Sequence, residues 1–177
     1  LPATMQVHIE VLQGSLRVIC TDRFTMGIVR EAMTSTSDGF TASFAVSAEE
    51  VRFVLRRMDG AQATVIVEED TLRITADESS EEIPGVRSEL PWRSALEKTL
   101  TPRPTPTGII AFNPKLLARL QEACPLAPDE PMLLHLGGEK GAVVATLGET
   151  FIGLVMPINL RGGARWMDIP KRPLDGW

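Results

Sequence analysis

Hydrophobic and polar residues alternate along short segments at the start of the chain. Met5 to Glu10 reads M-Q-V-H-I-E, Leu16 to Cys20 reads L-R-V-I-C, and Gly14 provides a turn between them. Alternation with a period of two is typical of a half-buried strand, because successive side chains point to opposite faces of a sheet. The pattern predicts two strands here and a third over Thr25 to Arg30, followed by a polar loop at Thr34 to Gly39.

A strand that runs directly into a capped helix comes next. Phe40 to Val46 alternates F-T-A-S-F-A-V, and Ser47 followed three residues later by Glu50 is a capping box. Asp59-Gly60 predicts the end of the helix. The apolar positions recur at helical spacing, namely Val51, Val54, Leu55 and Met58. The opposite face carries Arg52, Arg56 and Arg57.

The next segments combine a hairpin, an acidic stretch and a proline-rich stretch. Thr64 to Glu68 and Thr71 to Ala76 form a predicted hairpin that turns at Glu69-Asp70. We interpret the acidic stretch Asp77 to Glu82 as a solvated loop. Residues 88–108 predict irregular structure with a short helix over Trp92 to Leu100. The sequence T-P-R-P-T-P follows this helix. Because proline lacks an N–H, this stretch cannot form a helix interior, and it predicts a stiff linker.

After the linker the earlier order of elements returns. Gly108 to Phe112 predicts a strand, and Asn113 caps a helix with Pro114 at its first position, where the missing donor costs nothing. The apolar face of this helix consists of Leu116, Leu117 and Leu120. Three strands are then predicted, at Met132 to Leu136, Ala142 to Leu147 and Phe151 to Pro157.

Aligning Ser47 with Asn113 reveals a repeat of about 66 residues, made of a strand, a capped helix and three strands. This order predicts an α+β fold of antiparallel sheets with helices on one face. The segment Met5 to Arg30 matches the three-strand tail of a further unit, whose first strand and helix would precede Leu1.

Composition and charge narrow the class of protein. The 177 residues are 44% hydrophobic and 23% charged, with a net charge of −5, which is typical of a soluble globular protein and gives no overall nucleic-acid signature. No apolar run reaches the roughly 20 residues of a membrane span, and the first residues do not resemble a signal peptide. We expect a cytoplasmic protein in which Cys20 and Cys124 are reduced, buried thiols.

Residue patterns for catalysis or metal binding are sparse. The sequence contains no HExxH, CxxC, GxSxG or phosphate-binding loop. His8 and His135 lie in alternating strands, where a histidine is usually structural. An enzyme would depend on the acidic stretch Asp77 to Glu82 as a metal site. We therefore predict no enzyme, no metal site and no cofactor.

Two predicted helices carry basic residues four positions apart. Arg52 and Arg56 share one side of the first helix, and Lys115 and Arg119 repeat this spacing in the second. The spacing alone favours a solvated helix face. The alternative is that these cations face a phosphate backbone, in contacts that are independent of base sequence and weakened by salt.

Four segments share motifs with one known family, in the order in which that family has them. They are L-P-A-T-M-Q-V-H-I-E-V-L-Q-G-S-L-R-V-I-C-T-D-R-F (Leu1 to Phe24), I-P-G-V-R-S-E-L-P (Ile83 to Pro91), I-A-F-N-P-K-L-L (Ile110 to Leu117) and F-I-G-L-V-M-P-I-N-L (Phe151 to Leu160). They resemble the bacterial DNA polymerase III beta sliding clamp. The T-D-R-F turn is most similar to that of actinobacterial clamps, which points to such a bacterium or its phage as the source.

The resemblance implies a ring around duplex DNA that tethers polymerases and repair enzymes. Basic helices line the hole of such a ring, so Arg52, Arg56, Lys115 and Arg119 would face DNA. Partners dock short Q-x-x-L-F-like peptides into an apolar pocket between the last two domains. The matching positions are Thr21, Arg23, Phe24 and Met26 from the turn, Pro84 from the connection, and Leu154, Met156 and Pro157 from the last strand, with Asn113 and Leu116 at the pocket's edge.

The chain resembles a reduced or partial form of the clamp. Residues 1–91 match the middle domain without its first strand and helix, 92–107 form the proline-rich linker, 108–160 match the second half of the last domain, and 161–177 are a tail. Asn159 stands where the family often has Arg, and Ser88-Glu89 replaces a more basic or apolar pair.

Two functions follow from the resemblance. The first is a sliding-clamp-like processivity factor of replication or repair, which binds polymerase-type peptides and encircles DNA as a homo-oligomer. Edge strands near Met5 or Phe151 would then pair between chains. The second is a clamp mimic or regulator that competes for clamp-binding partners, or caps a host clamp, without encircling DNA. The missing half-domain and the net acidity favour the mimic, and the Arg52/Arg56 face argues against it.

Overall fold

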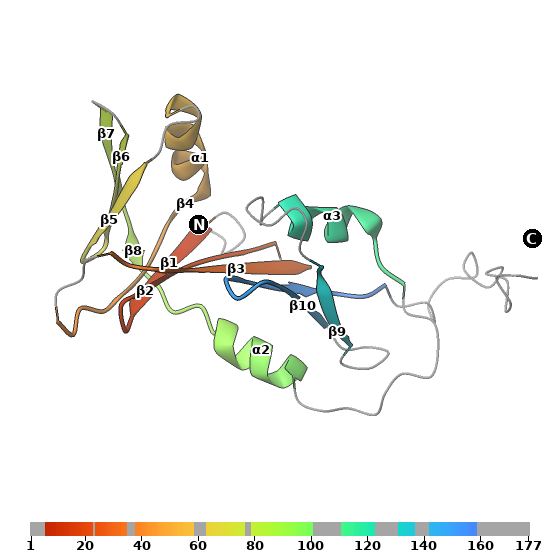
Figure 1. Ribbon diagram of the computed structural model, residues 1–177. Coiled ribbons are helices and arrows are strands. Elements are labelled where there is room, and N and C mark those ends of the chain that lie inside the picture. The colour runs from red at the N-terminus through yellow and green to blue at the C-terminus, as the bar shows by residue number, and fades with distance from the viewer. Residues whose placement is uncertain are drawn as a thin grey trace, which may run out of the picture.

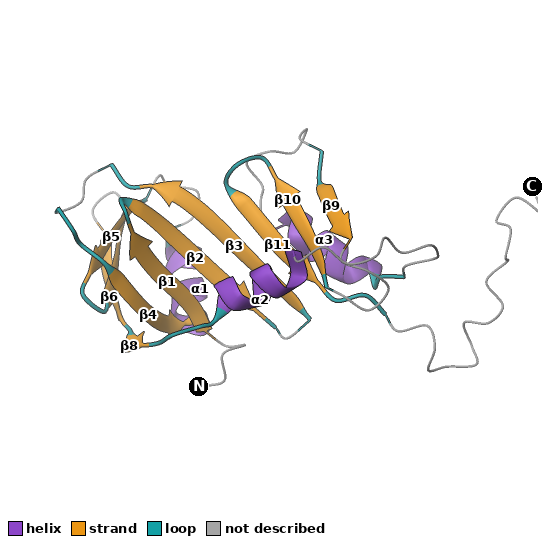
Figure 2. Ribbon diagram, turned by 90° about the horizontal axis from the view of Figure 1, so that it is seen from below, coloured by secondary structure: helices purple, strands orange, loops and turns teal. Residues whose placement is uncertain are grey.

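The computed structural model describes residues 6–22, 24–34, 38–58, 63–76, 79–100, 111–122, 131–136 and 142–158 (Figure 1). The strands of the large sheet are β1 (Gln6–Leu12), β2 (Ser15–Thr21), β3 (Thr25–Ala32), β4 (Ala42–Ser47), β8 (Val86–Arg87), β9 (Leu133–Leu136), β10 (Val143–Leu147) and β11 (Phe151–Val155). Their spatial order is β8-β4-β1-β2-β3-β11-β10-β9, with every neighbouring pair antiparallel (Figure 2). A second, three-stranded antiparallel sheet contains β5 (Thr64–Glu68), β6 (Thr71–Ala76) and β7 (Ser79–Pro84).

The turns and helix caps that the sequence predicts are present in these elements. Gln13 and Gly14 have positive φ angles of 53° and 69°, which makes the tight turn between β1 and β2. The Ser47 side chain accepts a hydrogen bond of 3.3 Å from the backbone N–H of Glu50 and caps α1 (Ala48–Arg57). Asn113 Oδ1 accepts one of 3.0 Å from the N–H of Lys115 at the start of α3 (Pro114–Glu122). The predicted short helix is α2 (Trp92–Leu100).

The helices lie on opposite faces of the large sheet. Figure 1 shows α1 and α3 on one face, here called the α1/α3 face, and α2 on the other, here called the α2 face. The alternation along β10 follows this division, because Val143, Ala145 and Leu147 pack with α3, whereas Val144 packs with residues of α2. The two helices of the repeat therefore share one face as predicted, and α2, which lies outside the repeat, covers the other.

The largest apolar core lies between α1, one end of the large sheet and the second sheet. Phe44 of β4 is 1% exposed at its centre, and Val54 and Met58 pack there from the predicted apolar face of α1. Leu55, predicted on the same face, is instead 53% exposed.

The prediction of a solvated acidic loop over Asp77 to Glu82 is wrong for the second half of that stretch. Ser79 to Glu82 belong to strand β7. Glu81 forms an ion pair of 2.7 Å with Arg57 of α1, and Glu82 forms one of 2.7 Å with Arg73 of β6. These arginines compensate the carboxylates, so the acidic segment pairs as a strand.

Two further predictions are wrong for reasons of tertiary structure. Cys20 is free but exposed, and it lines a groove between α1 and the ends of β1 and β2. The strands near Met5 and Phe151 are not edges, because β1 pairs with both β2 and β4, and β11 pairs with both β3 and β10.

The predicted strand before α3 is represented by a single bridge between Ala111 and Ile158. Cys124, residues 101–110 and the tail 161–177 lie outside the described residues.

The two halves of the large sheet join where β3 pairs with β11. Gly27 stands opposite Gly153 at this junction, and the Phe151 ring packs over both glycines. Leu120 of α3 fills the remaining space above Gly153. Glycine therefore allows an aromatic ring and a helix to approach the strand backbones closely.

Replacing Gly153 with Ala should lower the free energy of unfolding by about 1–3 kcal/mol, through overpacking. The added Cβ would lie 2.9 Å from Leu120 Cδ2 and 3.1 Å from Phe151 Cε1. Gly27→Ala is the matched control, because its Cβ would meet Phe151 Cε2 at an ordinary 3.5 Å. Denaturant unfolding of both variants measures the difference, and equal stabilities would contradict this account of the junction.

Candidate functional site

Five of the predicted pocket residues come together at one end of the β3–β11 junction. The registers pair Thr21 of β2 with Met26 of β3, and Met26 with Leu154 of β11. The backbone N–H of Met156 donates to the carbonyl of Phe24 at 2.9 Å, which fixes the turn against the end of β11. We call Thr21, Phe24, Met26, Leu154 and Met156 the docking cluster. Pro157, half-buried, follows directly.

The docking cluster combines a buried base with an exposed rim. Met26 and Leu154 are each 8% exposed, whereas Phe24 is 60% and Met156 42% exposed. Large apolar side chains with this exposure, gathered at the junction of two structural units, are typical of an interaction site.

Asp22 organises the turn that carries Phe24. Its Oδ1 accepts hydrogen bonds from the N–H of Phe24 at 3.0 Å, the N–H of Thr25 at 2.7 Å and the Thr25 hydroxyl at 2.8 Å. The Thr21 hydroxyl donates to the Thr25 carbonyl at 2.8 Å and closes the turn from the other side. One carboxylate oxygen thus sets the position of the exposed Phe24.

The second carboxylate oxygen of Asp22 binds α3. Arg119 Nη1 donates to Oδ2 at 2.6 Å, although the two residues are 97 positions apart in the chain. Burial alone would raise the pKa of Asp22, but the hydrogen bonds from Thr25 and Phe24 and the charge of Arg119 outweigh it and lower that pKa. The turn and α3 are therefore held by an ionised carboxylate.

The sequence did not predict the residues that cover the docking cluster from the α2 face. Leu90, Trp92 and Leu96 pack against the apolar group that contains Met26 and Leu154. The same apolar group contains Ile19, Ile28, Val144, Ala142 and Ile152. Leu90 and Trp92 flank a proline, and Trp92 and Leu96 are one helical turn apart. This spacing indicates an apolar side of the helix, but it does not show which surface α2 contacts.

Other predicted pocket residues lie elsewhere. Pro84 belongs to β7 in the second sheet and pairs with Thr71. Asn113 serves as the cap of α3, and Leu116 packs into the core on the α1/α3 face, opposite the side of the sheet that carries Met26 and Leu154. Arg23 lies outside the described residues. The structure therefore assembles the turn and the last strand, but not the connection or the helix start.

The four predicted DNA-facing residues are exposed on α1 and α3, which share one face of the large sheet (Figure 1). A groove of about 670 Å³ separates α1 from the ends of β1 and β2. Arg52 and Arg56 line its helix side, and Asp22 lines its sheet side. Asp22 also holds Arg119 of α3, so this carboxylate links the groove to α3, and Lys115 lies one helical turn from Arg119.

Among the described residues, His, Cys, Asp and Glu side chains do not gather into a group of three that could hold a metal ion. In the same part of the chain, no helix has the length and apolar character needed to span a membrane.

Solved structures with the same arrangement of sheets and helices are bacterial sliding clamps. The DNA polymerase III beta subunit of Thermotoga maritima matches with a TM-score of 0.60 at 15% identity, over 89% of this chain and 58% of that one. The sliding clamp of Bacillus subtilis gives 0.62 at 12% identity, over 89% and 57%. A sliding clamp of Pseudomonas aeruginosa, solved bound to griselimycin, gives 0.60 at 12% identity, over 97% and 61%. This chain has the sliding-clamp fold.

The chain spans 57 to 61% of the length of these three structures. No protein-family model matches the sequence, and a comparison with curated proteins finds no match. The likeness is therefore one of clamp architecture, and it confirms the predicted α+β fold of antiparallel sheets.

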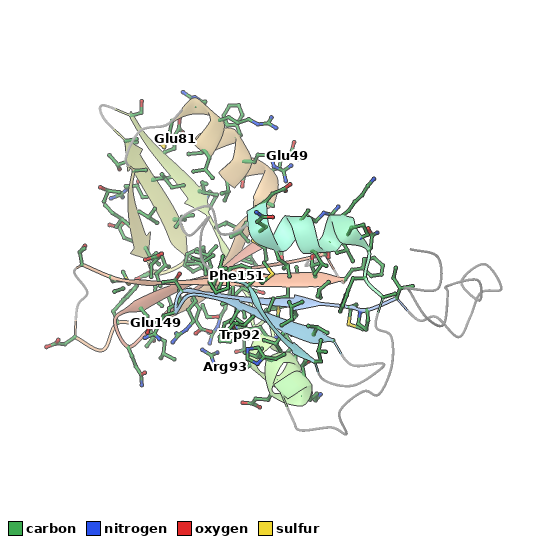
Figure 3. The ribbon with its side chains drawn as sticks, turned by 45° about the vertical axis from the view of Figure 1, so that its right-hand side comes forward. Glu49, Glu81, Trp92, Arg93, Glu149 and Phe151 are labelled. Carbon is green, nitrogen blue, oxygen red and sulfur yellow. The ribbon has the colours of Figure 1, made fainter. Side chains whose placement is uncertain are left out.

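Replacing Asp22 with Ala should lower the free energy of unfolding by about 1–3 kcal/mol at neutral pH, because two backbone donors and Arg119 lose their acceptor. The folded-state pKa of Asp22 is lowered from 3.8, so its contribution is present above that pH and is lost as the pH falls through the lowered value. The stability gap between the two proteins should therefore close in acid. Glu149→Ala, in the exposed turn between β10 and β11 (Figure 3), should change stability by less than about 0.5 kcal/mol. A gap that persists in acid would contradict this role.

Proposed function

We propose that this chain docks short linear peptides of DNA polymerases or repair proteins, as a sliding-clamp-like factor of DNA replication or repair. The docking cluster carries the proposal. Thr21, Phe24 and Met26 come from one structural unit and Leu154 and Met156 from the other, and they meet where these units share a sheet. The proposal assigns no catalytic step to the chain.

The chemistry of the docking cluster suits an apolar peptide. Methionine is flexible and polarisable, so Met26 and Met156 can adapt to different leucine or phenylalanine side chains. Phe24 offers an exposed aromatic ring, and aromatic residues dominate the binding energy of many interfaces.

We further propose that the α1/α3 face contacts duplex DNA. Arg52, Arg56 and Lys115 are exposed there, and cations on a helix face bind phosphates without regard to base sequence. A phosphate that reaches Arg119 must compete with Asp22, whose carboxylate is 2.6 Å from the guanidinium.

A second candidate function is a clamp mimic or regulator that competes for clamp-binding partners without encircling DNA. The observation that favours it is the pairing of Arg119 with Asp22, which occupies one of the cations of the α1/α3 face. A closed homo-oligomeric ring would be retained on circular DNA and released when the circle is cut. A mimic would sediment without DNA-dependent retention while still binding peptide.

Phe24→Ala and Met156→Ala should each weaken the binding of a fluorescently labelled Q-x-x-L-F peptide by about 10- to 30-fold, because each removes an exposed apolar side chain from the site. Phe53→Ala is the matched control, since Phe53 of α1 is 59% exposed against 60% for Phe24. Fluorescence anisotropy measures the affinities. Leu154→Asp should abolish binding, with circular dichroism to check the fold. Equal binding by the Phe24 and Phe53 variants would place the site elsewhere.

Arg52→Glu combined with Arg56→Glu should weaken binding to duplex DNA and reduce the slope of log K against log salt by roughly one for each phosphate that the protein no longer neutralises. Arg87→Glu combined with Lys98→Glu makes the same charge change at exposed positions of β8 and α2. Filter binding at several salt concentrations compares the two. Equally weakened binding in both variants would show that net charge, and not the α1/α3 face, determines the affinity.

A further inference from the structure

Helix α2 is the one described helix that lies outside the repeat, and it covers the face of the sheet that α1 and α3 leave open (Figure 2). Its Trp92 and Leu96 are half-buried and one helical turn apart, so they lie on the side that faces the sheet. Arg93, Ser94 and Glu97 are exposed. The helix is therefore amphipathic, with two large apolar contacts to the sheet.

The surface beneath α2 includes the base of the docking cluster. Leu90, Trp92 and Leu96 pack in one apolar group with Met26 and Leu154. These two side chains form the buried part of the proposed peptide site. Segment 90–96 of the chain thus packs against the same apolar group that supplies the base of the docking cluster.

A single carboxylate anchors the start of α2. Glu10 Oε2 accepts hydrogen bonds from Trp92 Nε1 at 3.2 Å and from Arg93 Nη1 at 2.8 Å, and Arg93 Nη2 donates to Oε1. Arg17 contributes a further ion pair of 3.1 Å to Oε1. The Arg93 guanidinium also stacks 4.2 Å from the Trp92 ring centroid. Figure 3 shows Trp92 and Arg93 at the end of α2 next to the sheet.

The charge state of Glu10 favours this anchor. Burial alone would raise the pKa of Glu10, but the hydrogen bonds from Arg93 and Trp92 and the charges of Arg93 and Arg17 outweigh it and lower the pKa. The carboxylate therefore stays ionised and binds Arg93 in a two-pronged geometry.

The contacts that hold α2 are few. The helix has nine residues, and helices shorter than about 12–15 residues are marginal in water without tertiary contacts. Among the side chains of α2 that the structure describes, Trp92 and Leu96 supply the apolar contacts, and both remain partly exposed. Its attachment is therefore of the size that a short peptide could replace.

We propose that α2 is an exchangeable internal ligand of the docking cluster: Leu90, Trp92 and Leu96 occupy the apolar surface over Met26 and Leu154, and a partner peptide binds after displacing them. This inference rests on the proposed peptide-docking function. It makes the anchor at Glu10 a determinant of peptide affinity, although Glu10 itself lies outside the docking cluster.

Releasing α2 should strengthen peptide binding, because the apparent affinity is reduced by the fraction of molecules in which the site is covered. Arg93→Glu places a carboxylate against Glu10 and should lower the apparent Kd of a Q-x-x-L-F peptide by about five- to tenfold. Arg73→Glu is the matched control, because Arg73 of β6 likewise pairs with carboxylates, those of Glu68 and Glu82, but in the second sheet. It should leave peptide affinity unchanged.

Trp92 reports directly on α2. The chain has three tryptophans, so Trp166→Phe with Trp177→Phe leaves Trp92 as the sole emitter. We expect its emission to shift to the red in the Arg93→Glu background without peptide. In the protein with native Arg93 we expect the same shift on saturation with peptide, as the indole leaves the apolar surface. Leu96→Ala should give a second, uncharged route to the same gain in affinity.

The outcomes separate this inference from the proposed function. Tighter peptide binding by the Arg93 and Leu96 variants, together with the emission shift, supports it. Equal binding by native and variant chains, with unchanged Trp92 emission at saturation, overturns it while the peptide-docking function stands. Absence of peptide binding in every variant, the released ones included, overturns the proposed function itself and this inference with it.

Discussion

The antiparallel pairing of β3 with β11 is the constraint on which the rest of the structure depends. It sets Gly27 against Gly153 and Met26 against Leu154, in segments more than a hundred residues apart. A slip of one residue would turn Met26 and Leu154 to opposite faces, because side chains alternate along a strand. The hydrogen bond from Met156 to Phe24, the contact of α3 with Asp22 and the surface beneath α2 all require this register.

Features encoded by neighbouring residues could be predicted from the sequence. The Ser47 and Asn113 caps, the turn at Gly14 and the alternating strands each rest on interactions within a few positions, and all are confirmed. The repeat allowed predictions beyond neighbouring residues, since it predicted strands on both sides of the β3–β11 junction. The family motifs then singled out Phe24 and Met156, whose pairing no local pattern shows.

Features that depend on distant contacts could not be predicted in this way. Arg119 was expected to face DNA, and no local pattern shows its ion pair with Asp22, which lies 97 positions away. The sequence predicted a short helix over Trp92 to Leu100, yet an apolar stripe does not specify which face of a sheet it covers, and Glu10 is 83 positions from Arg93. Cys20 was expected inside because thiols usually are. The structure instead exposes it in the groove beside α1, which only the tertiary arrangement creates.

The short connection between β8 and α2 has a consequence for competition at the docking cluster. Only Ser88 to Pro91 separate the strand from the helix, and a ligand tied by so short a chain is present at its site at an effective concentration in about the millimolar range. A free peptide must overcome this local excess. Under the proposed exchange, the site therefore favours partners that are themselves held close by over equally good sequences in free solution.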